Sequence, residues 1–136
     1  MPSISVERTI GKTKAAVLGG LIGYNTEKMG KQKHKRLAIS LREGDEIIGG
    51  IVGEVWAGVL FIQLFWMKPE LRGKDFGTKL IRAIEDEARR FGATRSYLDT
   101  MSFQAPGFYR TSGYEEFGSI EGYPGGVTRH WFTKAL

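Results

Sequence analysis

The residues best suited to chemistry lie at positions 72–78, where an apolar stretch gives way to a basic turn and then to a helical pattern. The first turn of a helix has backbone N–H groups without an intrahelical partner, and the helix dipole adds partial positive charge there. Arg72, Lys74 and Lys79 add full positive charges. The segment therefore predicts an anion site, for which phosphate is a natural ligand.

A plain strand-to-helix turn with basic side chains in solvent would produce the same residues. The segment lacks the phosphate-binding pattern GxxxxGK[ST] and also the GxGxxG pattern of dinucleotide-binding proteins. On these residues alone, phosphate binding and a basic surface turn are equally open.

Two carboxylates stand in stretches that otherwise read as strands. Glu54 interrupts the apolar residues 47–56, where an unpaired carboxylate would be costly, so we expect it to face a polar cleft or solvent. Asp99 lies in the short strand pattern 96–101 and could act through water, bind a cation or serve as a hydrogen-bonded structural group. Both are candidates for acid–base work.

Composition limits the other possibilities. The 136 residues include no cysteine and two histidines, so disulfides, thiolate zinc sites and a cysteine nucleophile are excluded, and we expect no metal. The length fits one domain, residues 1–136. No signal peptide or membrane-length apolar run stands out, which predicts a soluble, cytoplasmic protein.

The elements that must position these residues alternate between strand and helix patterns. Residues 3–9 predict a first strand, and residues 12–29 predict a helix that Gly19, Gly20 and Gly23 should bend or split. Residues 59–67 are almost continuously apolar, as in a strand buried on both faces.

The remaining patterns complete an α/β fold. Residues 77–91 predict an amphipathic helix whose charged side, Glu85 included, faces water. Further strands are expected at 35–42, 47–56, 96–101, 114–120 and 128–132, with a short helix at 106–110. This order predicts a single α/β domain with a mixed, mostly antiparallel twisted sheet flanked by helices.

Two motifs, taken with this order of elements, resemble the GNAT N-acetyltransferase superfamily. Residues 72–77, Arg-Gly-Lys-Asp-Phe-Gly, resemble the family's pyrophosphate loop Q/R-x-x-G-x-G/A. Tyr109, on a short helix just before Gly113-Tyr114, resembles the family's following motif. Gln104-Ala105, Tyr123-Pro124 and Lys134 favour a small-molecule branch.

The resemblance implies an enzyme that transfers the acetyl group of acetyl-CoA directly to the primary amine of a small molecule. The residues it assigns to acetyl-CoA are Leu64, Phe65, Trp66, Met67, Arg72, Gly73, Lys74, Asp75, Phe76, Gly77, Thr78, Gln104 and Phe108. It implies that Tyr109 protonates the departing CoA thiolate, since a phenol has a suitable proton to give. Packing in the core is the alternative role of Tyr109.

The acceptor side is less well marked. We expect Glu54, or else Asp99, to take a proton from the attacking ammonium group. Aromatic and amide side chains predict the acceptor surface: Tyr24, Asn25, Trp56, Phe103 and Tyr123. A homodimer is expected from exposed sheet edges, with no nucleic acid or membrane as partner.

Asp75 departs from the family pattern, because it stands where the first loop glycine is usual. A carboxylate opposes a diphosphate, and a side chain can block close approach of the backbone. Asp75 could instead cap the helix through its side chain. We expect acetyl-CoA binding to be weakened rather than abolished.

Two other functions stay open. The basic cluster Lys28, Lys31, Lys33, His34, Lys35 and Arg36 could bind nucleic acid, although it lacks the interleaved aromatic residues typical of such modules. A non-catalytic acyl-CoA sensor is the other alternative, and Asp75 is the reason to consider it.

Overall fold

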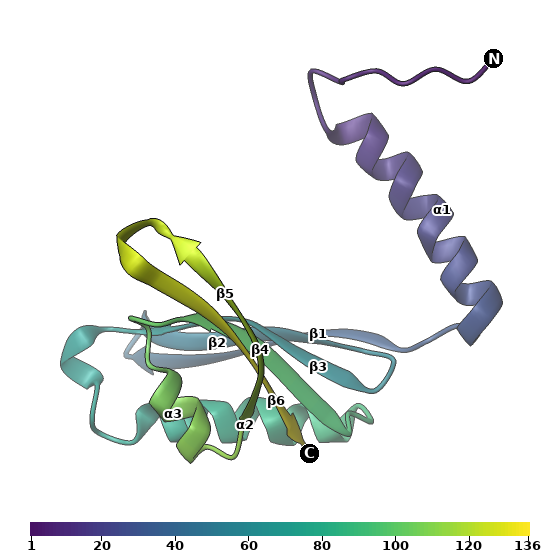
Figure 1. The fold of residues 1–136 in the computed structure, drawn as a ribbon. Helices are drawn as coiled ribbons and strands as arrows, with labels where there is room; N and C mark the ends of the chain where they lie inside the picture. The colour runs from purple at the N-terminus through teal and green to yellow at the C-terminus, as the bar shows by residue number, and fades with distance from the viewer. The chain divides into compact units, whose positions relative to one another are not determined.

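The computed structural model describes all 136 residues, which form two compact units, Met1–Gln32 and Lys33–Leu136. In the first unit, one continuous helix, α1 (Gly11–Met29), follows an extended segment (Figure 1). Two expectations are therefore wrong. Residues 3–9 form no strand, because they pair with no other strand, and strand structure depends on such pairing.

The three glycines do not bend or split α1 either. Each helical glycine costs about 1 kcal/mol relative to alanine, which weakens a helix without removing its hydrogen bonds. No residue of α1 is buried, and Val17, Leu21 and Ile22 are among its exposed apolar side chains. No helix of the chain combines the length and hydropathy needed to cross a membrane.

The second unit is built on a six-stranded sheet in the order β1-β2-β3-β4-β6-β5. Its strands are β1 (His34–Glu43), β2 (Glu46–Trp56), β3 (Val59–Met67), β4 (Arg95–Met101), β5 (Glu115–Tyr123) and β6 (Val127–Ala135). All neighbours are antiparallel except β3 and β4. The predicted α/β class and the mixed, mostly antiparallel sheet are confirmed.

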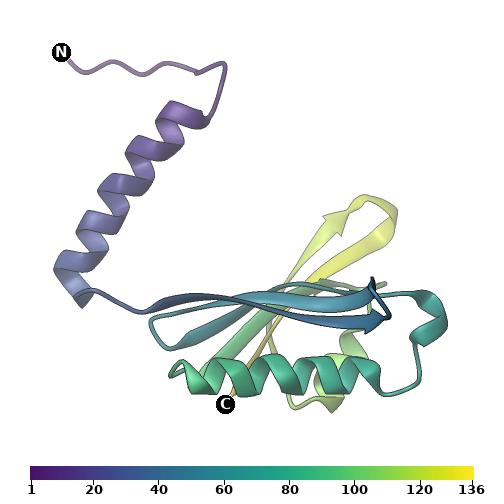
Figure 2. The same ribbon diagram turned by 180° about the vertical axis from the view of Figure 1, so that it is seen from behind.

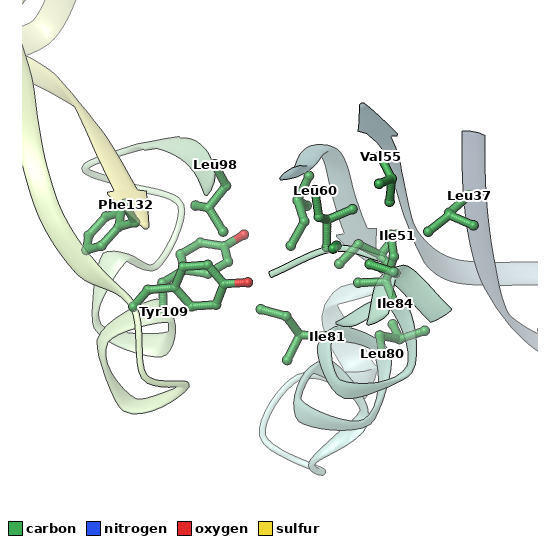
Figure 3. Close-up of a cluster of buried hydrophobic side chains, with 14 residues drawn as sticks. Leu37, Ile51, Val55, Leu60, Leu80, Ile81, Ile84, Leu98, Tyr109 and Phe132 are labelled. Carbon is green, nitrogen blue, oxygen red and sulfur yellow. The ribbon is translucent and has the colours of Figure 1, made fainter. Parts of the chain in front are cut away.

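Two helices cover one face of this sheet, α2 (Phe76–Arg90) and α3 (Pro106–Thr111) (Figures 1 and 2). Single 3-10 turns, η1 (Pro69–Leu71) and η2 (Pro124–Gly126), precede α2 and join β5 to β6. Ile81 and Ile84 of α2 face Ile51 and Leu60 of the sheet, and all four are almost fully buried (Figure 3). This apolar layer fixes α2, and with it the start of the helix, on the sheet.

Burial differs from expectation in two elements. β3 is not buried on both faces, because α2 and α3 cover only one, and Leu64 and Trp66 on the other are 67% and 55% exposed. Glu85 is buried at 2% exposure rather than facing water. Its carboxylate accepts hydrogen bonds from Lys134 Nζ at 3.0 Å and from the Tyr114 hydroxyl at 2.8 Å, so the buried charge is compensated.

Candidate active site at the fork of the sheet

The two parallel strands at the centre of the sheet separate part of the way along. β3 pairs with β4 only over Val59–Phe61 and Arg95–Tyr97. Beyond Phe61, β3 stays with β2, and beyond Tyr97, β4 stays with β6. We call this divergence the fork. Backbone groups of β3 past Phe61 lack a β4 partner and are free to bind a ligand.

The start of α2 packs against the end of β3 at the open end of the fork. A Cβ added at Gly77 would lie 3.1 Å from the Met67 side chain and 3.3 Å from the Phe108 ring. The glycine therefore lets the helix approach β3 and α3 closely. Leu64 and Trp66 face away from this contact, whereas Phe65 and Met67 are partly buried.

The first turn of α2 has the free N–H groups that an anion needs. Its first main-chain bond runs from Lys79 N–H to the Asp75 carbonyl, at 3.1 Å. The N–H groups of Phe76, Gly77 and Thr78 therefore have no partner within the helix. Arg72, Gly73 and Lys74 are exposed in the preceding turn, and the positive charges of Arg72 and Lys74 add to the attraction for an anion there.

Asp75 stands at the N-cap of α2 but makes no side-chain capping bond, so the expectation that its carboxylate caps the helix is wrong. The backbone explains why: Asp75 has φ 67°, ψ 4°, a left-handed conformation, whereas a side-chain cap requires extended backbone. This conformation also explains the family preference for glycine here, since glycine adopts it without strain. Aspartate tolerates it better than most residues.

Tyr109 lies in an aromatic cluster beside the fork. Its ring contacts Phe65 of β3, Phe108 and Phe132, with centroid separations of 6.3, 5.3 and 6.1 Å. Burial, with a smaller effect of the charge on Asp99, raises the pKa of Tyr109 to about 12. The phenol therefore keeps its proton at any working pH and can act as a hydrogen donor.

Glu54 and Asp99 lie together on the sheet face opposite α2. Side chains alternate along a strand, so burial of Val55 and Leu98 against the helix side places Glu54 and Asp99 on the open face. Both carboxylates raise the pKa of Tyr97, after the larger effect of burial, which shows that both lie near its ring. Two residues 45 positions apart in sequence thus share one surface.

Each of these carboxylates has a cationic or imidazole partner from a different strand. His34 Nε2 lies 2.8 Å from Glu54 Oε2, and two nitrogens of Arg129 lie 2.6 and 2.8 Å from Asp99 Oδ1. Arg129 also stacks over Trp131, at 4.9 Å from the ring centroid. These pairings depend on strand register, which no local pattern specified.

The structure distributes the other predicted site residues more widely. The Gln104 side-chain oxygen accepts a hydrogen bond from Met101 N–H at 2.7 Å and holds the turn after β4, where Phe103 is 73% exposed. The Tyr123 hydroxyl accepts a long hydrogen bond, 3.5 Å, from Arg129. Trp56 ends β2 at the closed end of the fork, and Tyr24 and Asn25 belong to α1 in the other unit.

Part of the basic cluster is engaged in local contacts. Lys33, His34 and Lys35 line an open cavity of about 350 Å³ together with Val55 and Phe91. Lys35 Nζ lies over the Phe91 ring at 5.2 Å. This part of the cluster therefore contacts the fold and is not a continuous free strip of charge.

Comparison with known proteins agrees with this geometry. A model of the acetyltransferase (GNAT) family matches residues 19–114. Blasticidin-S acetyltransferase of Streptomyces morookaense is 42% identical over 95 residues, 69% of this chain and 70% of that protein. Acetyltransferase Atu2258 of Agrobacterium fabrum is 31% identical over 124 residues, 90% of both chains.

A solved structure extends the agreement to the fold. The crystal structure of an acetyltransferase from Bacillus cereus matches 98% of both chains with a TM-score of 0.89 and 30% identity. The motif around Asp75, the forked sheet and these matches lead to one assignment. The chain belongs to the GNAT family of acetyltransferases.

Proposed function

We propose that this acetyltransferase transfers the acetyl group of acetyl-CoA to a primary amine of a small molecule. The observation that carries the proposal is the juxtaposition of three features at the fork: unpaired β3 backbone, the free N–H groups that begin α2, and the Tyr109 phenol. The family uses acetyl-CoA, and the relative from Streptomyces morookaense is named for the acetylation of a small molecule, blasticidin S.

The residues fit the group that would bind. The N–H groups of Phe76, Gly77 and Thr78 would hold the diphosphate, with Arg72 and Lys74 adding charge. Gly77 leaves no Cβ between the helix and Met67, which supports close approach of the backbone. When bound, acetyl-CoA would supply a thioester carbonyl that an amine can attack.

In this proposal the protein stabilises the negative charge that develops on the thioester oxygen and on the departing sulfur. A backbone N–H of the unpaired part of β3, among Leu64 to Met67, would donate to the developing oxyanion. Tyr109 would donate its proton to the departing sulfur. Burial opposes loss of that proton, because it raises the pKa of Tyr109, so the phenol must regain a proton from the carboxylate that accepts the amine proton.

Glu54 and Asp99 are the proposed acceptors of the amine proton. The Oε2 atom of Glu54 is occupied by His34 and the Oδ1 atom of Asp99 by Arg129, which leaves one oxygen of each carboxylate available. The charge of Asp99 also raises the pKa of Tyr109. This effect favours Asp99 over Glu54 as the carboxylate nearer to the reacting atoms. The remaining predicted acceptor residues, Tyr24, Asn25, Trp56, Phe103 and Tyr123, stay predictions.

The proposal also includes a single functional domain and a homodimer. The family model includes residues of both units, which supports one functional domain over residues 1–136. The sheet ends in β1 and β5, and such edges are able to pair with a second copy in a homodimer.

An acetyl-CoA-dependent thiol-release assay across amine classes, with blasticidin S as the first acceptor, tests the proposal. Turnover with a primary amine, and an N-acetylated product by mass spectrometry, would support it. Tight acetyl-CoA binding without turnover on any acceptor would favour the sensor alternative. Salt-sensitive nucleic-acid binding without acetyl-CoA binding would favour the basic-cluster alternative.

A further inference from the structure

Two aromatic rings at the closed end of the fork form a surface that the proposed chemistry does not use. Phe61 of β3 and Tyr97 of β4 are the last paired residues before the strands diverge. Their rings stack with centroids 4.7 Å apart and planes 6° apart, and both side chains are only partly buried. They stand on the sheet face opposite α2, because their neighbours Leu60 and Leu98 are buried on the helix side.

Negative charge flanks this ring pair from both sides. Glu54 is the Cα partner of Phe61 on β2, and Asp99 follows Tyr97 by two residues on the same face of β4. His34 and Arg129 hold one oxygen of each carboxylate and so fix its position. The arrangement therefore offers an apolar surface between two oriented carboxylates, the combination that suits an alkyl chain ending in a cation.

We infer that this platform, Phe61, Tyr97 and Glu54, binds a second cationic group of the acceptor, an ammonium or guanidinium that is not itself acetylated, and that Asp99 is then the carboxylate that takes the proton of the attacking amine. The inference rests on the proposed function and specifies its substrate class as amines with two cationic groups. The spacer of such an acceptor packs along the stacked rings while its free amine reaches the fork. Charged and apolar contacts then act on different parts of one molecule.

A matched set of acceptors tests the inference: 1-aminobutane, 1,4-diaminobutane and (4-aminobutyl)guanidine, which share one spacer length. The kcat/KM for each acceptor with two cationic groups should exceed that for 1-aminobutane about tenfold, the size expected of one partly desolvated cation contact. Phe61→Leu and Glu54→Gln should each reduce this ratio several-fold, and added salt should reduce it too. The ratio cancels any effect of these variants on the acyl-transfer step itself.

The matched control is Phe117→Leu, which changes an exposed aromatic residue of β5 outside the platform and should leave the ratio unchanged. Equal kcat/KM values for the three acceptors, or a ratio that Phe61→Leu and Glu54→Gln do not alter, would overturn the inference.

Calorimetric titration of (4-aminobutyl)guanidine separates this inference from the proposed function. Binding that Phe61→Leu weakens, without acetylation of any amine, would refute the proposed function and support the cation site. Acetylation of 1-aminobutane as efficient as that of the acceptors with two cationic groups, without detectable binding of (4-aminobutyl)guanidine, would support the function and refute the site.

Discussion

The two sides of the fork use different kinds of groups. The side toward α2 presents backbone: free N–H groups at the helix start, a glycine at the contact with β3, and positive φ angles at Gly73 and Asp75. The open face presents side chains, the Phe61–Tyr97 stack and the carboxylates of Glu54 and Asp99. Backbone groups are the same in every sequence, so this side suits an invariant co-substrate, whereas side chains can differ with the acceptor.

The first way to test this contrast is to remove the side chain to which we assign proton donation on the α2 side. Tyr109→Phe deletes the proposed proton donor and leaves the aromatic cluster packed, so acetyl transfer should fall by about 10²- to 10³-fold. Acetyl-CoA affinity should stay within about twofold of the wild-type value, because the phenol is not one of the N–H groups proposed to bind the diphosphate. Steady-state kinetics and calorimetry measure the two effects.

An unchanged rate in Tyr109→Phe would leave Tyr109 as a core residue only. The matched control is Tyr123→Phe, which removes a phenol on the open face that accepts only a long bond from Arg129. We expect it to alter the acceptor KM more than kcat.

The second test fills the close contact at the helix start. In Gly77→Val the new Cβ would lie 3.1 Å from Met67 and 3.3 Å from Phe108, with further methyl groups beyond it. The start of α2 must shift, so we expect a loss of about 1–3 kcal/mol in unfolding free energy and about tenfold weaker acetyl-CoA binding. Urea unfolding and calorimetry give both values.

Gly107→Val is the control for this variant, because a Cβ at Gly107 has no neighbour within 4 Å. Valine is at least as favourable in a helix as glycine, so Gly107→Val should not lower the free energy of unfolding. Equal losses of acetyl-CoA affinity in the two variants would show that the contact with Met67 and Phe108 does not determine the position of the N–H groups at the start of α2.

The third test uses alkaline pH to probe burial on the α2 side. Burial raises the pKa of Tyr109 to about 12, above the value near 10 expected for the unfolded chain. Between pH 10 and 12 the unfolded state loses a proton that the folded state keeps. Stability should be unaffected below pH 10 and then fall by up to about 1.4 kcal/mol per pH unit for this group.

Burial also raises the pKa of Tyr114 and of Tyr97, so three tyrosines contribute to this fall. Urea unfolding at pH 9 and pH 11 measures it, and Tyr109→Phe should make the decline shallower. Tyr24→Phe, at an exposed position of α1, should leave the slope as in the wild type. A decline of equal steepness in wild type and Tyr109→Phe would contradict the burial of the phenol.

The smallest expected effect separates charge from conformation at Asp75. Asp75→Gly removes a carboxylate and permits φ 67° without strain, so the acetyl-CoA dissociation constant should fall a few-fold. Asp75→Asn also removes the charge but keeps a side chain that tolerates this backbone conformation. Similar gains in both variants would assign the effect to charge, and a gain in Asp75→Gly alone would assign it to the backbone.

Calorimetry with acetyl-CoA measures these affinities. Unchanged or weaker binding in Asp75→Gly would show that the carboxylate does not oppose the diphosphate, and that Arg72 or Lys74 compensates for it in the complex.

The sequence by itself predicted the turn and the helices on the α2 side of the fork. The turn at 72–78, the amphipathic helix and Tyr109 before Gly113 are local patterns, and local patterns specify helix starts and turns directly. The order of strands from residue 35 onward was predicted for the same reason. Residues 3–9 were not, because a strand pattern without a partner does not form a strand.

Tertiary structure decided what no local pattern could. Glu85 lies on the polar side of its helix by sequence, yet Lys134 and Tyr114, 49 and 29 residues away, hold it as a buried ion. The stacking of Phe61 on Tyr97 and the partners of Glu54 and Asp99 likewise follow from the register of distant strands. Helix starts depend on neighbours in sequence, whereas paired side chains depend on the fold that brings distant strands together.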